Sequence, residues 1–140
     1  MNAFDADALI YAAVPGHPLG RRVVALIPTE PFRAGDTPTG VGSLLLLPEV
    51  LSKPVRDGQT DEVRRLSALL NALDLRPLDR ATAELAVILS TYYRLRAADA
   101  IHLATAVNVG ADRFIINTRR VFSDTIEEIQ IVYLDDLPDP

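Results

Sequence analysis

The chain has 140 residues, of which 49% are hydrophobic, and a formal net charge of -5 at pH 7. A chain of this length buries a single core without a disulfide or a structural metal, so we expect one domain over residues 1–140. It contains no cysteine, which excludes cysteine catalysis and thiolate metal ligation. The acidic balance argues against a broad basic surface for nucleic acid, but not against an enzyme that uses metal ions in an acidic cleft.

The beginning of the chain does not have the pattern of a secretory signal. MNAFDADALIYAAV carries two acids and no basic residue before its apolar stretch. The apolar run at residues 44–47 is far too short to span a membrane. We therefore expect a cytoplasmic protein with no membrane partner.

The apolar pattern and the positions of proline and glycine predict strands that alternate with helices. The helix that contains Glu49 is expected to begin after Ser43, a suitable N-cap, and to end before Pro54. This alternation predicts an α/β protein with a parallel sheet covered on both faces. In chain order, we expect a strand at 3–9, helices near 11–13 and at 19–27, a loop at 28–42 with one short strand, helices at 43–53 and 61–74, a strand at 75–78, helices at 80–93 and 97–107, and strands at 113–117 and 130–134.

Three acids lie in unusually apolar segments. Asp99 is in the first turn of the alanine-rich helix AADAIHLATAV, where an ionised carboxylate is costly to bury unless a cation or donor compensates it. Asp5 in MNAFDADALIYA and Glu49 in GSLLLLPEVLSKP have similar surroundings. Ligands of parallel α/β sheets gather at the carboxyl ends of the strands, and carboxylates there suit Mg²⁺ or Mn²⁺. The three acids therefore predict a site for a divalent cation.

Each candidate also has a purely structural interpretation. Asp5 could cap the following helix, Glu49 could lie on a solvated helix face, and Asp99 could interact with the helix dipole. His102 lies three residues after Asp99, on the same helix face. It either orients that carboxylate, contacts substrate, or packs at the edge of the core. The sequence leaves these alternatives open.

The run LRAADAIHLATAVNVGADRFIINTRR, at residues 95–120, closely resembles the third-acid helix and following strand of PIN domains, particularly VapC-type toxins of bacterial toxin-antitoxin pairs. FDADALIYA and GSLLLLPEVLSKP are similar to the first two acid motifs of that family, and IQIVYLDDL resembles its last strand. The resemblance implies a PIN-like, three-layer α/β/α fold with a central, mainly parallel sheet of four to five strands.

The resemblance also implies an activity and partners. Asp5, Glu49 and Asp99 would be the catalytic, metal-binding acids of a Mg²⁺ (or Mn²⁺) dependent endoribonuclease that hydrolyses RNA phosphodiester bonds. The expected partners are an RNA substrate, a cognate antitoxin that inserts a basic side chain into the acidic cleft, and a second copy of the chain in a homodimer. Helices near 44–51 and 66–73 are apolar enough for a dimer surface, although core burial explains them equally well.

The resemblance extends to residues around the three acids. Asp7 fits a polar position that supports the metal site, or else caps the helix. Asn117 fits an amide after the fourth strand. Thr118 follows it and is expected to support the metal site or contact the substrate. Arg119 either holds an RNA phosphate or lies on the rim of the cleft.

The sequence departs from the family pattern at its fourth acid. By one alignment that acid falls on Thr118 and by the other on Arg120, and neither is a carboxylate. Asp124 is close in sequence, but we expect it to be a surface acid. Fewer carboxylates would hold the cation more weakly and lower the activity.

Two other functional classes follow from these observations. A catalytically weak or inactive PIN-like domain would use its acidic groove only to bind a protein partner, and the missing fourth acid supports this alternative. A phospho-receiver domain is disfavoured, because it needs a lysine after a late strand and the only lysine is Lys53.

Overall fold

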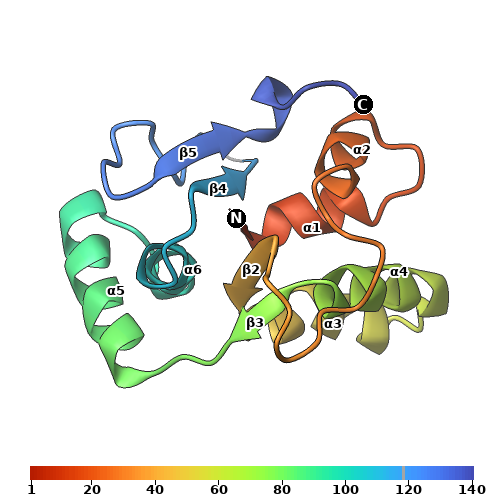
Figure 1. Ribbon diagram of the computed structural model, residues 1–140, viewed down its shortest axis with the longest axis horizontal. Coiled ribbons are helices and arrows are strands. Elements are labelled where there is room, and N and C mark those ends of the chain that lie inside the picture. Colours follow the sequence, from red (N-terminus) through yellow and green to blue (C-terminus); the bar gives the residue numbers. More distant parts are fainter. Residues whose placement is uncertain (118) are drawn as a thin grey trace.

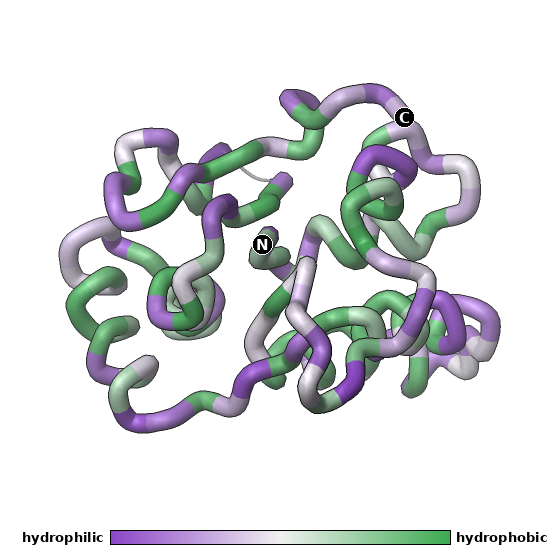
Figure 2. The backbone as a smooth tube through the Cα atoms, in the orientation of Figure 1, coloured by the Kyte–Doolittle hydropathy of each residue, from purple (hydrophilic) through white to green (hydrophobic). Residues whose placement is uncertain are grey.

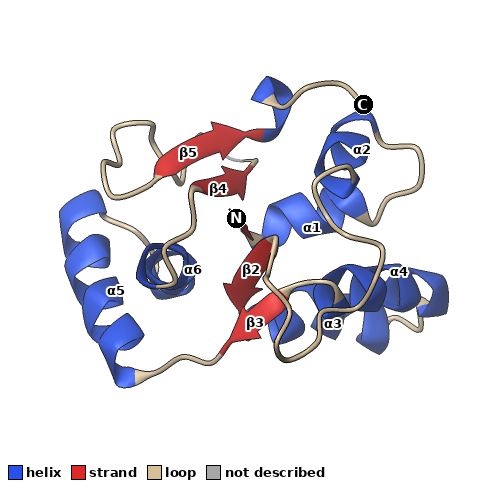
Figure 3. Cartoon of the chain, in the orientation of Figure 1, coloured by secondary structure: helices blue, strands red, loops and turns tan. Residues whose placement is uncertain are grey.

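The computed structural model describes residues 1–117 and 119–140. Its helices and strands alternate along the chain, as Figures 1 and 3 show. The strands are β1 (Asn2–Phe4), β2 (Gly40–Ser43), β3 (Asp74–Arg76), β4 (Arg113–Ile116) and β5 (Gln130–Tyr133). The helices are α1 (Ala6–Ala12), α2 (Pro18–Val24), α3 (Leu46–Arg56), α4 (Thr60–Asn71), α5 (Arg80–Tyr93) and α6 (Ala97–Asn108), followed by the short 3-10 helix η1 (Leu134–Asp136).

Within the described residues the strands form one five-stranded sheet in the order β3-β2-β1-β4-β5, and every neighbouring pair is parallel. β1 lies at the centre, where Ala3 pairs with Val41 on one side and with Phe114 on the other. Parallel neighbours require crossover connections, which the helices supply. This arrangement confirms the predicted three-layer α/β/α fold.

The two faces of the sheet bury two separate apolar clusters. Phe4 and Ile115 face a cluster completed by α1, α2, α3 and α4, whereas Ala3 and Phe114 face a cluster completed by α5 and α6. Successive strand residues point to opposite faces, which explains this division. Figure 1 shows the two groups of helices on opposite sides of the strands. In Figure 2 hydrophilic residues collect at the α3–α4 connection, away from the sheet.

The sequence predicted several elements closely. α5 has the predicted bounds, and α4 and α6 differ from expectation by a few residues at their ends. α6 is buried along most of its length, and Gly110 beyond its end has a φ of 75°, a backbone conformation that favours glycine. None of the helices in the described part of the chain combines the length and the apolar character needed to cross a bilayer.

The first strand and the Glu49 helix have other bounds than predicted. The first strand ends at Phe4 rather than residue 9, because α1 begins directly after Asp5 with residues that favour helix. The Glu49 helix begins later than predicted and continues through Pro54. Ser43 instead ends β2, and its Oγ accepts a hydrogen bond from the N–H of Leu45 at 3.1 Å. Pro54 is buried inside this helix, which reaches Arg56 although proline supplies no backbone donor.

Core burial accounts for part of the apolar surface considered for a dimer. Leu46, Leu66 and Leu70 are at most 1% exposed, whereas Leu44 and Leu47 are 40% and 36% exposed. On α5 the apolar spacing of Leu85, Ile88, Leu89 and Tyr92 predicts one buried stripe, but only part of it is buried: Leu89 is buried, whereas Ile88 and Tyr92 are exposed. A homodimer therefore remains a prediction without a surface that the sequence could assign.

Candidate functional site

The sheet brings the three acid-bearing segments to one edge. Asp5 directly follows β1, and a short turn leads from β2 into α3, which carries Glu49. α6 packs on the sheet and is followed by β4, which begins at the opposite edge. The helix therefore runs away from the carboxyl edge, and its first turn, with Asp99, lies where the strands end. Ligands of parallel α/β sheets bind outside the carboxyl ends of the strands. This edge is therefore the candidate site.

Asp5 is the most enclosed of the three acids, with 8% of its surface exposed. Its N–H donates to the carbonyl of Ile115 at 3.1 Å, which continues the pairing of β1 with β4 by one residue. Asp5 takes the N-cap position of α1, yet its side chain makes no capping hydrogen bond. The Asp5 carboxylate therefore does not act as a side-chain cap of α1, although the backbone of Ala6 lowers its pKa.

Glu49 has a specific partner on the opposite side of the sheet. Its Oε1 lies 2.6 Å from Nε2 of His102, which donates a hydrogen bond to it. The Glu49 side chain is 32% exposed, whereas that of His102 is 1% exposed. Glu49 is therefore not an acid on a freely solvated helix face.

The acids are close enough for the charge of one to affect the pKa of another. Burial raises the pKa of the Asp5 carboxyl to about 7, and the charges of Asp7 and Asp99 add to this effect. Burial, together with the charge of Glu49, also raises the pKa of Asp99. Residues distant in the sequence therefore form one electrostatic cluster, which we call the acid cluster: Asp5, Asp7, Glu49 and Asp99.

Only limited positive charge balances the acid cluster. The His102 ring lowers the pKa of Asp5, and Arg96 lowers that of Asp99. In the described ranges, however, no lysine or arginine lies within 4.0 Å of Asp5, Glu49 or Asp99 as an ion-pair partner. Uncompensated carboxylates held close together favour a cation. The oxygen donors fit a hard divalent ion such as Mg²⁺ or Mn²⁺.

The acid cluster is not a formed coordination shell. Across residues 1–117 and 119–140, no three His, Asp or Glu side chains are arranged so that they could hold one metal ion as they stand. Glu49 is bound to His102 through Oε1 alone. Three of these side chains could hold one ion only after some of them changed their torsion angles.

The positions around the three acids have different outcomes. Asp7 lies inside the first turn of α1, so it is not the N-cap, and its charge acts on both Asp5 and Asp99. Asn117 directly follows β4 and is half-buried. The prediction for Thr118 lies outside the described residues. Arg120 and Asp124 are exposed, as expected for Asp124.

The side chain of Arg119 is held by other residues of the protein, near the end of β5. Its Nη2 donates to Oδ1 of Asp135 at 2.7 Å and approaches Oδ2 of Asp136 at 3.4 Å. Its guanidinium carbon also lies 3.9 Å from the centroid of the Tyr133 ring. Of the two interpretations left open by the sequence, these contacts favour a position on the rim over one that holds an RNA phosphate.

Replacement of this arginine should therefore have small effects. We expect Arg119→Gln to change the free energy of unfolding little, because its ion pairs are exposed. RNA cleavage should stay within about threefold of the wild-type rate, since the contacts are to the protein itself. Chemical denaturation and a cleavage assay measure the two effects. A tenfold loss of cleavage at unchanged stability would restore the substrate role.

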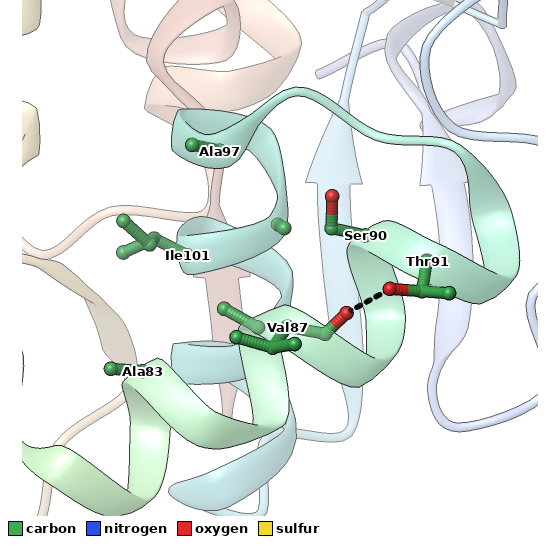
Figure 4. Close-up of a pocket in the computed structure, with 8 residues that line it drawn as sticks. Ala83, Val87, Ser90, Thr91, Ala97 and Ile101 are labelled. Carbon is green, nitrogen blue, oxygen red and sulfur yellow. Dashed lines mark hydrogen bonds between the residues drawn. The ribbon is translucent and has the colours of Figure 1, made fainter.

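A hollow of about 290 Å³ lies apart from the acid cluster, between α5 and α6. Small side chains such as Ala83, Ala97 and Ala100 form it, and Val87 and Ile101 border it. Figure 4 also shows its only marked polar contact, in which Oγ1 of Thr91 donates to the carbonyl of Val87 at 2.8 Å. The hollow holds no titratable side chain, so it does not compete with the sheet edge as a site for hydrolysis.

Sequence reasoning found the three acids but not the contact of Glu49 with His102. His102 was considered as a partner of Asp99, one turn away on the same helix, or as a core residue. The structure places it in the core and binds it to Glu49, 53 residues earlier. The spacing between Asp99 and His102 indicates which face of the helix they share. Which residue of another element contacts that face depends on how the elements pack around the sheet, and the structure is needed to show it.

Comparison with known proteins agrees with the fold and with the family that the motifs resemble. A family model of the PIN domain matches residues 3–126. A solved structure described as "Toxin-antitoxin complex from Klebsiella pneumoniae" superposes with a TM-score of 0.74 at 22% identity, over 96% of this chain and 98% of that chain. Another, "Structure of FitAB bound to IR36 DNA fragment", superposes with a TM-score of 0.65 at 16% identity, over 96% and 95% of the two chains. No curated protein matches the sequence.

Proposed function

This chain belongs to the PIN-domain family, as its motifs predicted, and from that premise we propose that it is a metal-dependent endoribonuclease of the VapC toxin type. The main support is the acid cluster at the carboxyl edge of a parallel sheet. There the charges of Asp7 and Asp99 add to the raised pKa of Asp5, and the charge of Glu49 adds to that of Asp99. Carboxylates held this close together destabilise the folded state, and a bound cation would compensate their charge.

In this proposal the side chains of the protein bind and orient the metal ion. Asp5, Glu49 and Asp99 hold Mg²⁺ or Mn²⁺, with Asp7 close enough to strengthen the negative field. Bound there, the ion supplies an activated water and neutralises charge on the RNA phosphate. The buried position of Asp5 excludes water from one side of the site, which strengthens electrostatic interactions within it.

The partners are part of the proposal. We propose a cytoplasmic toxin that acts on RNA, forms a homodimer, and is neutralised by an antitoxin whose basic side chain enters the acid cluster. Support comes from the negative charge of the chain and from the structural neighbour described as a toxin-antitoxin complex. A basic side chain would occupy the place of the cation, which gives a physical reason for inhibition.

A cleavage assay tests the activity. With Mn²⁺, the purified chain should cleave RNA, and Asp99→Asn should lower the rate by about a hundredfold, since one charge of the cation site is lost. Asp61→Asn, which removes an exposed acid of α4, should leave the rate unchanged. Equal cleavage by the wild type and Asp99→Asn would indicate a contaminating nuclease. In cells, the wild type should arrest growth, and the product of an adjacent antitoxin frame should relieve the arrest.

A second candidate function has its own support. A PIN-like domain that only binds a protein partner would not need the fourth acid, and Arg120, one of the two matching positions, is an exposed arginine. The absence of a ready three-ligand arrangement in the described residues points the same way. This alternative predicts no metal-dependent cleavage of any RNA, even at high Mn²⁺, together with a metal-independent complex with the partner.

A further inference from the structure

The hydrogen bond between His102 and Glu49 connects the two helical layers across the sheet edge. α3 belongs to the cluster on one face of the sheet and α6 to the cluster on the other. Among the described residues, this is the one side-chain hydrogen bond between α3 and α6. Asp99 lies one turn before His102 on α6, so the bond also fixes where Glu49 lies relative to Asp99.

The two partners differ in their freedom to move. His102 is 2% exposed, and its helix neighbours Leu103 and Ala104 are completely buried, so its ring has little room to rotate. Glu49 is partly exposed and has a long side chain that loses substantial rotamer entropy when it is ordered. Within the described part of the chain, its carboxylate has no other hydrogen-bond partner. His102 therefore orders a side chain that would otherwise be mobile.

The other ring nitrogen shows that stability alone does not explain this histidine. Nδ1 of His102 is buried and has no hydrogen-bond partner within the described residues. A buried polar atom without a partner costs about 1 to 3 kcal/mol, so an apolar residue of similar shape would suit the core better. The ring makes a single polar contact, and that contact goes to a member of the acid cluster.

We propose that His102 is a positioning residue that holds the Glu49 carboxylate by one oxygen, so that its other oxygen is available to the metal ion beside Asp99. This inference rests on the proposed function. Carboxylates that ligate metals are commonly fixed by hydrogen bonds of this kind, and loss of such a partner typically costs about 10- to 100-fold in metal affinity.

The test is Mn²⁺ binding to the purified protein, measured by titration calorimetry without RNA. His102→Phe keeps a ring but removes the donor, and we expect it to weaken Mn²⁺ binding by about 10- to 100-fold. His102→Gln retains an amide donor and should restore most of the affinity. In an assay at saturating Mn²⁺, His102→Phe should leave the KM for RNA unchanged. Thermal denaturation confirms that each variant is folded.

A double-mutant cycle separates an action through Glu49 from a general effect on the core. In a Glu49→Gln background, His102→Phe should weaken Mn²⁺ binding little further, because the partner is already lost. Full additivity, unchanged affinity in His102→Phe, or equal losses in the Phe and Gln variants would each overturn the inference while the nuclease stands. Tighter binding by His102→Phe would overturn it too, since the histidine would then withdraw Glu49 from the ion. If the wild type and Asp99→Asn both fail to bind Mn²⁺, both the inference and the proposed function are wrong.

Discussion

Asp5→Asn should abolish cleavage and at the same time stabilise the metal-free protein. We expect the rate of Mn²⁺-dependent RNA cleavage to fall by about a thousandfold, because Asp5 is the most buried acid of the cluster and no other carboxylate follows β1 at this depth. The free energy of unfolding in EDTA at pH 8 should rise by about 2 to 4 kcal/mol. A residue that served only the fold would show the opposite effect on stability.

The pH dependence follows from the raised pKa of Asp5. Burial moves this pKa from 3.8 to about 7 in the folded chain. Between these values the folded protein holds a proton that the unfolded chain has lost, so this group makes stability fall as pH rises from about 4 to about 7. Above pH 7 both states are ionised and the penalty is constant. The gain from Asp5→Asn should therefore be full at pH 8 and absent at pH 4.

Urea denaturation at pH 4, 6 and 8 in EDTA measures this dependence. Added Mn²⁺ should raise the stability of the wild type at pH 8 and leave that of Asp5→Asn unchanged, because ligands stabilise only the state that binds them. Glu30→Gln, at an exposed loop position, is the control and should alter neither cleavage nor the pH dependence. A loss of stability in Asp5→Asn at pH 8 would contradict the assignment of Asp5 to the acid cluster.

Local sequence patterns were sufficient for the parts of the site that local structure determines. The alanine-rich segment around Asp99 predicted a buried helix and an acid at its start, and both are observed. Asp5 was predictable as a strand-end acid, although the helix begins sooner than expected. The common edge followed from a general rule about parallel sheets.

Contacts between distant segments could not be predicted in the same way. The contact of Glu49 with His102 depends on which helices cover which face, and an amphipathic pattern does not contain that information. The same limit explains Ile88 and Tyr92, whose spacing suits a buried stripe although they are exposed. The contacts of Arg119 could not be predicted either, because its partners lie on later elements: Tyr133 on β5 and Asp135 on the 3-10 helix η1.

The position of α1, and with it Asp5, depends on a close approach between α1 and α2. A Cβ atom at Gly20 would lie 2.0 Å from the carbonyl oxygen of Tyr11 and 3.2 Å from Cα of Ala12. These are backbone atoms, so no side-chain rotation can relieve the contact. Gly20→Ala would gain helix propensity of about 1 kcal/mol but must push the two helices apart.

We expect Gly20→Ala to lower the free energy of unfolding by roughly 3 kcal/mol, as severe overpacking does in a close-packed core. Because α1 follows Asp5 directly, the displacement should also weaken Mn²⁺ binding in the molecules that remain folded. Arg21→Ala, on the exposed side of the same turn, should change stability by only about 0.5 kcal/mol. Urea denaturation and Mn²⁺ titration measure both effects. Wild-type stability in Gly20→Ala would show that α2 can move away from α1 without cost, and that the acid cluster does not depend on this contact.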